Sequence, residues 1–401
     1  MKGTETGLLR EGIQTSPADP FSIESIVNAQ REDCTLREMG PAVFFSRYDM
    51  IGIFRYDAVK AILGDWRRFS SKDRPFNDAM NAVPQILVTD DPPEHGRIRA
   101  ILMQFFTPVQ MQAVRDQFVV VAERIVDEAL ALARVGNVDI VADIARPFIM
   151  DAFPDMLGLP DKGRSDLLMF GEAVFNGVGP RTQFFYDSMK RCEPGFRWVM
   201  ENTTREKVAP GGLAARTYEL ADKGEITAEE ADLLVKTMLG AGFDTTIASI
   251  SNCLHAMTAN PDQWDLLHSD PTRAKRAFEE GLRFDPPARM MGRVVTQDAN
   301  VQGISFKKGD KIGLFLNAAC RDPDRYDNPE QFDITRTSAN IGFGSGIHQC
   351  LGQALARLEG EVLLSVLARR IKRIEPAGSG ERLINNNIQA WTKAPVRLHS
   401  A

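Results

Sequence analysis

The sequence predicts a mainly helical protein with a minor β component, folded as a single domain. Helical periodicity dominates from residue 90 to residue 367, whereas strand-like alternation is confined to two patches, 42–56 and 294–316. No linker rich in proline, glycine and serine divides the 401 residues, and no internal repeat is visible. We therefore expect one domain over residues 21–401, preceded by a disordered polar segment at residues 1–20.

The first elements are short. Residues 23–39 predict a helix, and two strand-like runs, 42–46 and 51–56, follow it. The polar link Arg47-Tyr48-Asp49 between these runs favours a hairpin. Residues 57–63 are helical again.

Turn signals divide the helical body that follows. Segments 91–93, 209–212 and 285–287 each contain proline, which ends a helix at or before the preceding residue. The second strand patch contains the turn Lys307-Lys308-Gly309-Asp310, and residues 396–399 predict a last strand. The sheet component is therefore minor.

The longest predicted helix is the most informative. Thr227 and Glu230 form a capping box, and helical character then continues to Asn260, where Pro261 stops it. This length exceeds that of most globular helices, so the helix is expected to cross the whole molecule.

Composition excludes several classes of protein. The chain is 43% hydrophobic and 25% charged, which is typical of a soluble globular protein with a large core. The net charge of −6 gives no reason to expect a nucleic-acid partner. Residues 1–20 contain neither a membrane-spanning run nor a signal-peptide core, so we expect a cytoplasmic protein without a membrane anchor.

Five cysteines are spread along the chain, and they form no CxxC pair. An odd number at wide spacing disfavours both a disulfide framework and a structural zinc site. The cysteines are Cys34, Cys192, Cys253, Cys320 and Cys350.

One of them, Cys350, lies in a glycine-rich stretch that precedes a predicted helix at 351–370. Gly344 and Gly346 allow a positive φ and a close approach of the backbone to a flat group. The N-terminal end of the helix favours a thiolate at Cys350, and a thiolate is a ligand for iron. A lone cysteine is more often a small buried core residue. The flanking Phe343 and His348 at fixed spacing favour the iron ligand instead.

The stretch from Phe343 to Gly352 resembles the haem-binding loop of the cytochrome P450 superfamily, Phe-Gly-x-Gly-x-His-x-Cys-x-Gly, at every fixed position. The resemblance implies a single-domain cytochrome P450 fold, with a long central helix over haem b. It makes Cys350 the thiolate ligand of the haem iron. It also places Phe343 and Gly344 against the haem and directs His348 to a haem propionate.

The middle of the long helix reads Ala241-Gly242-Phe243-Asp244-Thr245-Thr246, and these residue types weaken a helix. A local distortion there would open space and present polar groups. In an arbitrary helix, Asp244 would face solvent and Thr245 would bond a carbonyl one turn back. The superfamily has a similar run over the distal haem face. By that resemblance Thr245 would hydrogen-bond the oxygen being activated, and Asp244 would relay protons to it.

Glu280 and Arg283 lie three residues apart on one helical face, and such a pair is usually a solvated contact of about 0.2–0.5 kcal/mol. The superfamily has a Glu-x-x-Arg pair at this distance before its cysteine, buried behind the haem. Its third member is an arginine in a Pro-Glu-Arg-Phe segment. This chain has Gln331 there and offers Arg336 just beyond, which leaves the third partner open.

His95 and Arg99 share one face of the helix that follows residues 91–93, where a solvated surface pair is the alternative. The resemblance makes them partners of the haem propionates, together with Arg293 and His348, through charge-assisted hydrogen bonds. Four motifs thus occur in the order that the superfamily shows.

Within the superfamily the sequence looks most like the bacterial para-methoxybenzoate O-demethylases. In that family an arginine and a serine before the Asp-Pro-Pro segment help to bind the benzoate carboxylate, and the matching positions here are Ala82 and Gln85. An Arg-Ser pair on the long helix is replaced by Lys236-Thr237. The resemblance therefore implies a pocket less suited to a carboxylate, with Gln85, Thr237 and Ala241 on its wall.

Aromatic positions of the pocket differ as well. Phe175 is retained, whereas Val178 and the pair Met291-Gly292 stand where those demethylases tend to have phenylalanine. Ordinary core packing is an equal alternative for these side chains. If they do line a pocket, it is wider, and we expect a small aromatic substrate such as a methoxylated phenol, oxidised by hydroxylation or O-demethylation.

The resemblance implies a monooxygenase that takes electrons from a ferredoxin and a ferredoxin reductase, because one haem domain leaves no room for a flavin or nicotinamide domain. Arg369, Arg370, Lys372 and Arg373 could face an acidic ferredoxin, or could simply complement a helix end. A haem sensor or carrier and a peroxide-dependent enzyme are the alternatives. The presence of both Asp244 and Thr245 favours the oxygen-activating enzyme.

Overall fold

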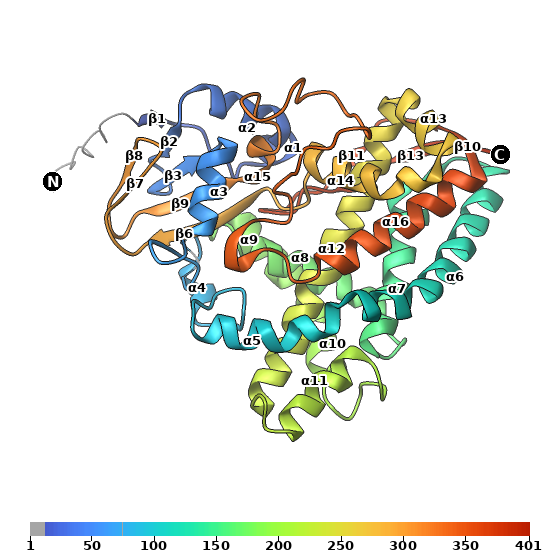
Figure 1. Cartoon of the computed structure of the whole chain (residues 1–401), viewed down its shortest axis with the longest axis horizontal. Helices are drawn as coiled ribbons and strands as arrows, with labels where there is room; N and C mark the ends of the chain where they lie inside the picture. Colours follow the sequence, from blue (N-terminus) through green and yellow to red (C-terminus); the bar gives the residue numbers. More distant parts are fainter. Residues whose placement is uncertain (1–12, 74) are drawn as a thin grey trace.

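The two strand patches of the sequence join into one six-stranded sheet (Figure 1). The computed structural model describes residues 13–73 and 75–401. The sheet has the order β1-β2-β3-β9-β6-β4, and smaller sheets are formed by β10-β13-β5, β11-β12 and β7-β8. The strands are β1 (Gln14–Ser16), β2 (Ala42–Phe45), β3 (Met50–Ile53), β4 (Phe69–Ser70), β5 (Val138–Asp139), β6 (Met290–Val295), β7 (Ala299–Val301), β8 (Ile304–Phe306), β9 (Lys311–Phe315), β10 (Ile371–Pro376), β11 (Glu381–Arg382), β12 (Trp391–Lys393) and β13 (Pro395–Ser400).

Helices form the larger part of the molecule, beside and below the sheet in Figure 1. The helices are α1 (Ile23–Val27), α2 (Ala29–Glu38), α3 (Tyr56–Gly64), α4 (Asp78–Asn81), α5 (Glu94–Met103), η1 (Gln104–Phe106), α6 (Pro108–Ala133), η2 (Ile140–Ala145), α7 (Arg146–Leu157), η3 (Arg164–Asp166), α8 (Leu167–Asn176), α9 (Gln183–Arg191), α10 (Glu193–Asn202), α11 (Leu213–Asp222), α12 (Ala228–Ala259), α13 (Pro261–Ser269), η4 (Pro271–Arg273), α14 (Ala274–Phe284), α15 (Leu316–Ala319), η5 (Gly346–His348) and α16 (Gln353–Arg370).

The predicted hairpin is confirmed: β2 and β3 pair antiparallel, with Phe45 opposite Met50. Strand β9 then adds parallel to β3, and β6 adds antiparallel to β9. These pairings place Met291, Gly292 and Arg293 of β6 in the same sheet as the N-terminal hairpin, with β9 between them. The predicted last strand is β13, which pairs with β10.

The N-terminal segment differs from the expectation of disorder up to residue 20. Gln14, Thr15 and Ser16 pair in parallel with Val43, Phe44 and Phe45, so this stretch extends the sheet. Residues 1–12 lie outside the described part of the chain. Hydrogen bonding along the β2 edge therefore orders a polar segment whose composition gave no sign of it.

Helix α12 forms the axis of the helical part, as the long-helix prediction requires. Its capping box is present: the Thr227 hydroxyl accepts from the Glu230 N–H at 3.1 Å, and the Glu230 carboxylate accepts from the Thr227 N–H at 2.8 Å. The helix contacts α7, α8, α11, α14 and α16. It is long and apolar enough to cross a membrane, but 56% of its most apolar window is buried inside the fold, as in the core helix of a soluble protein.

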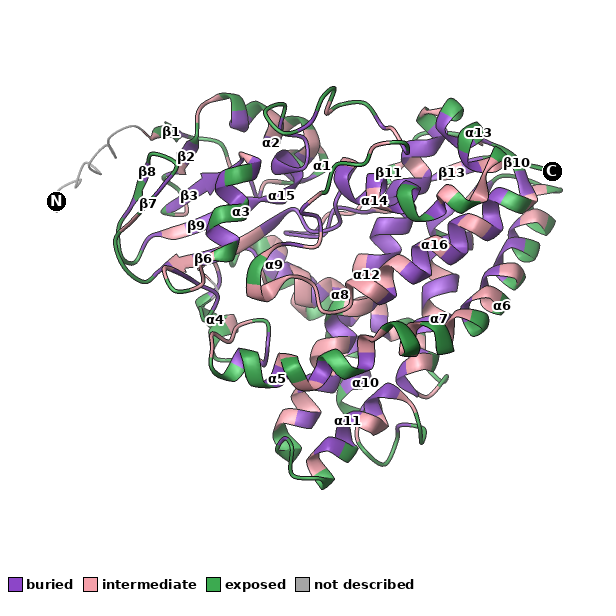
Figure 2. Cartoon of the chain, in the orientation of Figure 1, coloured by how far each residue is buried: buried purple, intermediate pink, exposed green. Residues whose placement is uncertain are grey.

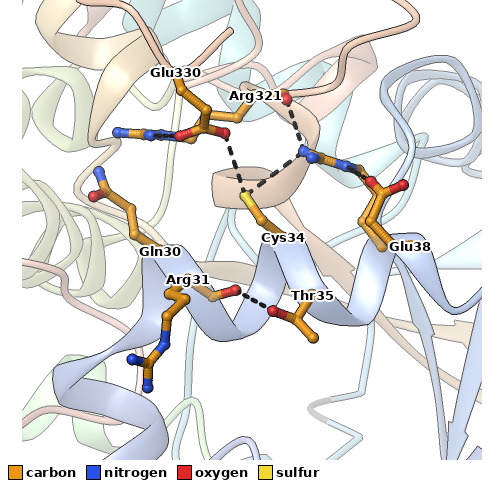
Figure 3. A pocket seen from close by; sticks show the side chains of 8 residues that line it. Gln30, Arg31, Cys34, Thr35, Glu38, Arg321 and Glu330 are labelled. Carbon is orange, nitrogen blue, oxygen red and sulfur yellow. Dashed lines mark hydrogen bonds and ion pairs between the residues drawn. The ribbon is translucent and has the colours of Figure 1, made fainter.

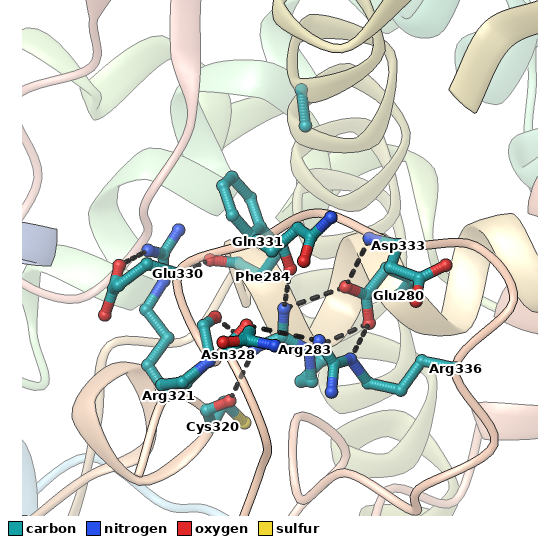
Figure 4. Close-up of polar contacts among 12 residues, drawn as sticks. Glu280, Arg283, Phe284, Cys320, Arg321, Asn328, Glu330, Gln331, Asp333 and Arg336 are labelled. Atoms are coloured by element: carbon teal, nitrogen blue, oxygen red, sulfur yellow. Dashed lines mark hydrogen bonds and ion pairs between the residues drawn. The ribbon is translucent and has the colours of Figure 1, made fainter. Parts of the chain in front are cut away.

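Behind the helical core, Glu280 and Arg283 form a buried bidentate pair, with both N···O distances 2.8 Å. Arg336 approaches Glu280 at 3.5 Å and donates to the Asp327 carbonyl, so it takes the place of the third member that the sequence left open (Figure 4). The Arg283 guanidinium also donates to the carbonyls of Cys320, Pro329 and Gln331. The network ties α14 to the loop that leads to the cysteine.

Candidate functional site

The cysteine loop is closed by its own backbone. The Cys350 N–H donates to the Phe343 carbonyl at 2.9 Å. Gly344 and Gly346 both have φ of +73°, and a Cβ at Gly346 would lie 2.4 Å from the Leu63 carbonyl oxygen of α3. Both glycines are therefore required by the conformation, and the second also by the close approach of α3.

Burial raises the pKa of the Cys350 thiol above its ordinary value. The Gly352 N–H and the guanidiniums of Arg99 and Arg357 oppose that rise. The N–H at the start of the helix thus favours the thiolate, as the sequence predicts, although burial without a bound cation has the larger effect on the pKa of Cys350. Arg357 also stacks over the Phe343 ring, 4.5 Å from its centroid. A cation bound at the sulfur would supply the missing stabilisation of the thiolate.

The predicted propionate partners come together in the structure. The rings of His95 and His348 lie 4.4 Å apart, and the Nε2 atoms of both are buried without a hydrogen-bond partner. Burial, together with Arg293, His95 and Arg99, lowers the pKa of His348 to about 3. Burial lowers the pKa of Arg293 to about 10, with Asp91 opposing. Arg99 and Arg293 thus both act on the neutral His348 ring, and Arg99 also acts on the neutral His95 ring. Each ring has a buried Nε2 atom without a hydrogen-bond partner.

This arrangement fits a haem with two propionates. Unpartnered buried donors are costly, about 1–3 kcal/mol each, and two carboxylates would satisfy them through charge-assisted hydrogen bonds. His95, His348, Arg99 and Arg293 would hold the propionates, and Cys350 would hold the iron. A thiolate-ligated haem activates dioxygen, because the ligand pushes electron density toward O–O cleavage.

Helix α12 is accessible along one stripe in its middle (Figure 2). Thr237, Ala241 and Thr245 repeat every four residues on one face, and all three are half-buried or exposed, whereas Thr246–Leu254 are buried. The expected distortion is absent, because the α-helix is continuous here. The Thr245 hydroxyl donates to the Ala241 carbonyl at 2.8 Å. The hydroxyl hydrogen of Thr245 is therefore used in this bond, whereas the lone pairs of the hydroxyl oxygen can accept a hydrogen bond from a ligand.

Asp244, two turns after Thr237 and also half-buried, lies at the edge of that stripe, and its carboxylate is directed to α8. A Cβ added to Gly171 of α8 would be 2.0 Å from Asp244 Oδ2, so the carboxylate occupies the space beside this glycine. Burial and the charge of Glu172 raise the pKa of Asp244 to about 8, while Arg146 acts in the opposite direction. Asp244 therefore carries a proton at neutral pH, as a proton donor requires.

The remaining predicted pocket residues are distributed as follows. Phe175 of α8 packs against a small cluster that contains Ala248 of α12, so core packing accounts for part of its surface. Gly292 lies against Pro75, whose Cγ would be 2.8 Å from an added Cβ. The side-chain amide of Gln85 donates to the Met80 carbonyl. Val178 follows α8, and Met291 packs partly against the sheet core. Their contact with a substrate stays a prediction.

The family pattern of cytochrome P450 matches residues 212–396, which include α12 and the cysteine loop. Cytochrome P450 CYP199A2 of Rhodopseudomonas palustris is 39% identical over 97% of this chain and 96% of its own length. The chain belongs to the cytochrome P450 family. It is therefore a haem-thiolate monooxygenase, and its cofactor is haem b with a cysteine ligand.

Solved structures support the same fold. Cytochrome P450 CREJ, solved in complex with (4-ethylphenyl) dihydrogen phosphate, is 25% identical, and the match has a TM-score of 0.85 over 95% of this chain and 99% of that chain. CYP108D1 from Novosphingobium aromaticivorans is 21% identical, with a TM-score of 0.80 over 94% of this P450 and 97% of that chain. The latter likeness concerns the fold alone.

Two residues beside the haem loop were missed from the sequence. No role was predicted for Arg357, whose guanidinium lies over the Phe343 ring in the structure. Glu359, also on α16, is fully buried, and neither carboxylate oxygen has a hydrogen-bond partner among the described residues. Burial raises its pKa to about 8, and the nearby Thr246 hydroxyl opposes that rise. A buried acid of this kind has no local sequence signal.

We expect Glu359→Gln to stabilise the P450 at pH 8 by about 1–3 kcal/mol relative to the native chain. A carboxyl whose pKa is higher in the folded state than in the unfolded state loses stability as pH rises between the two values, and glutamine removes that loss. Thermal unfolding of the holoenzyme at pH 5 and pH 8 checks the result. Glu361→Gln, which removes a partly exposed carboxylate paired with Arg115, is the control. A gain that is the same at both pH values would contradict the assignment.

The cations offered for a ferredoxin are mostly paired with acidic residues of this chain. Arg369 and Arg370 pair with Glu123, Arg370 also with Asp127, and Arg373 with Glu375. They lie at the end of α16 that is farthest from the cysteine, roughly 25 Å along the helix. Their charge is therefore largely neutralised and distant from the haem loop.

A hollow of about 500 Å³ opens on another face, between α2 and the loop that carries Arg321 and Glu330 (Figure 3). Cys34 lies in it, 3.9 Å from a Glu330 oxygen. None of the predicted site residues lines this hollow.

Proposed function

We propose that this P450 uses electrons from a ferredoxin and its reductase to hydroxylate or O-demethylate a small neutral aromatic compound, such as a methoxylated phenol, in the cytoplasm. The proposal of a neutral substrate rests on the residues at the positions that bind the carboxylate in the resembling demethylases. Positions 82 and 85 are alanine and glutamine, and Lys236 is held by Asp232 at 2.5 Å on its own helix. A benzoate carboxylate would thus be desolvated in this pocket without a partner at the positions that anchor it in the resembling demethylases.

The size of the substrate is supported by two further observations. The accessible stripe of Thr237, Ala241 and Thr245 offers one hydroxyl group on each side of a methyl group, which suits a ring with one polar substituent. CREJ, solved with a para-substituted phenyl phosphate, shares the fold closely. A single aromatic ring is therefore the substrate class that we favour.

Titration of the ferric protein checks this proposal. We expect 4-methoxyphenol to shift the haem spectrum toward the high-spin form at a concentration at least tenfold lower than para-methoxybenzoate, because transfer of an unpaired carboxylate costs more than 1.4 kcal/mol. Gln85→Arg is the matched variant and should restore binding of the benzoate. Tight binding of para-methoxybenzoate to the native protein, with no binding of 4-methoxyphenol, would contradict the proposal of a neutral aromatic substrate.

The ferredoxin proposal is supported by a surface beside the cysteine loop. Helix α3 contacts η5 of that loop, and Arg67 follows α3 as an exposed cation, 4.7 Å above the Trp66 ring. A cation on an aromatic ring close to the haem suits an acidic partner better than the paired arginines at the far end of α16.

A further inference from the structure

Glu279 and Arg357 form an ion pair beside the haem loop. Glu279 lies on α14, one residue before the buried Glu280, and Arg357 lies on the second turn of α16. The Arg357 Nε donates to Glu279 Oε1, and the Arg357 Nη1 donates to Gln353 Oε1 at 2.7 Å. The side chains of Arg357 and Glu279 are 29% and 31% exposed, so the pair is partly shielded from water.

The arginine of this pair reaches the haem loop through an aromatic ring. Its guanidinium lies over Phe343, 4.5 Å from the ring centroid. Side chains of an α-helix lean toward its N-terminal end, so a residue on the second turn of α16 can reach back over the loop that precedes the helix. The Phe343 carbonyl in turn accepts from the Cys350 N–H. The positive charge therefore lies on the ring of the residue that closes the cysteine loop.

Glu279 also contacts the start of the same loop. The side-chain amide of Asn340 donates to the Glu279 carbonyl oxygen and to Glu279 Oε2, at 3.1 Å in each case, and Asn340 Oδ1 accepts from the Gly342 N–H at 2.9 Å. A Cβ at Gly342 would lie 3.0 Å from the Leu282 carbonyl oxygen of α14, so the loop has little room to shift. One glutamate thus contacts both the start of the loop and the arginine above it.

The ion pair is not needed to hold α14 against α16. Phe278 of α14 is buried against Gly360 of α16, where an added Cβ would lie 2.2 Å from Phe278 Cδ2. A partly exposed ion pair adds little to the stability that such packing provides. The position of the guanidinium over Phe343 therefore points to an electrostatic role.

The charge of Arg357 acts on the sulfur of the loop. Arg357 and Arg99 both lower the pKa of the Cys350 thiol, against the effect of burial. Arg99 is one of the groups that would hold the propionates, so a propionate would oppose its charge. Arg357 is opposed by Glu279, its partner on α14. The chain itself therefore sets the balance of charge that this pair presents to the sulfur.

We propose that Arg357 and Glu279 are positioning residues that set the reduction potential of the haem iron through the charge above Phe343. Reduction adds one electron to the ferric haem, supplied by a one-electron donor protein in turnover and by dithionite in the test. Arg357 stabilises the added negative charge and Glu279 destabilises it. Salt and water screen partly buried charges incompletely. The inference rests on the haem-thiolate assignment, and not on the substrate or the ferredoxin proposed above.

The reduction potential of the substrate-free holoenzyme tests the proposal. In Arg357→Gln we expect the equilibrium constant for reduction to fall about three- to tenfold, where tenfold corresponds to about 59 mV for one electron. In Glu279→Gln we expect a rise of the same order, because the positive charge is no longer opposed. Arg357→Lys keeps the charge, and its potential should lie closer to the native value than that of Arg357→Gln.

Arg369→Gln and Glu123→Gln are the matched controls. This second ion pair, with an N···O distance of 3.5 Å, joins the other end of α16 to α6. Arg369 lies about 18 Å farther along the helix than Arg357. Neither control should change the potential. Haem content, the spin state in the absorption spectrum and thermal unfolding are measured for every variant, so that a loosened loop is recognised.

Two results would overturn the proposal. Equal potentials in the native protein, Arg357→Gln and Glu279→Gln would show that the charge above Phe343 does not act on the iron. Shifts of the same sign in both variants would show that the pair only holds the loop in place, because a loosened loop responds alike to the loss of either partner. The titration needs neither substrate nor ferredoxin, so a failure of the proposed function would leave its outcome intact.

Discussion

Cys350→Ala is expected to give a folded protein that retains little haem and has no detectable oxygenase turnover. The Cys350 sulfur is approached by the Gly352 N–H, Arg99 and Arg357, an environment that favours a negative sulfur once a metal is bound. Alanine removes the ligand, and the nearby His348 cannot replace it because its ring packs against His95 at the propionate end. Haem content per chain, circular dichroism and product formation check the result.

Cys34→Ala is the control for that experiment. Cys34 is a half-buried free thiol on α2, beside the hollow of Figure 3, and its loss should leave haem content and turnover unchanged. A Cys350→Ala protein that keeps both full haem content and native turnover would rule out the thiolate assignment.

Asp244→Asn is expected to lower product formation by about 10²–10³ while binding of substrate and haem stays near native, since general acid–base groups contribute about that factor. Asparagine keeps the shape beside Gly171 but holds no transferable proton. Because the pKa of Asp244 is raised to about 8, its protonated form predominates below that pH. Native turnover should therefore decline as pH rises through 8, and this decline should vanish in the variant.

The measurement is product formed per NADH consumed between pH 6 and pH 9, together with the spectral shift on substrate binding. Asp265→Asn, an exposed carboxylate on α13, is the matched control and should behave as the native protein does. Native product yield in Asp244→Asn across this range would mean that protons reach Thr245 by another route.

Elements with local chemical signals were predicted correctly. The capping box at Thr227 and Glu230 gave the start of α12, Pro261 gave its end, and the polar link at 47–49 gave the hairpin. The pairing of that hairpin with β9, which in turn pairs with β6, could not be predicted, because β9 lies some 250 residues away and no local pattern specifies it. The order of residues 14–16 could not be predicted either, because no local pattern specifies their pairing with residues 43–45.

The predictions for the site divide in the same way, into residues that a family motif indicates and contacts that depend on helix packing. Cys350, His95, His348 and Arg293 were predicted through the family resemblance, and the structure brings the last three together around two unused imidazole nitrogens. The position of the Asp244 carboxylate beside Gly171 could not be predicted, because it depends on how α8 crosses α12.

The ion pairs of Arg369 and Arg370 could not be predicted for a related reason. Their partners Glu123 and Asp127 lie on α6, far away in the sequence. A run of charges reveals its sign but not its partners, so the sequence alone could not show that these arginines are neutralised.

The absorption spectrum of the reduced protein with carbon monoxide tests the haem-thiolate assignment most directly. We expect the strongly red-shifted Soret band of a haem whose fifth ligand is a thiolate, in proportion to haem content and absent from Cys350→Ser, in which a hydroxyl replaces the sulfur. A carbon monoxide complex with the spectrum of a histidine-ligated haem, unchanged in Cys350→Ser, would contradict the account.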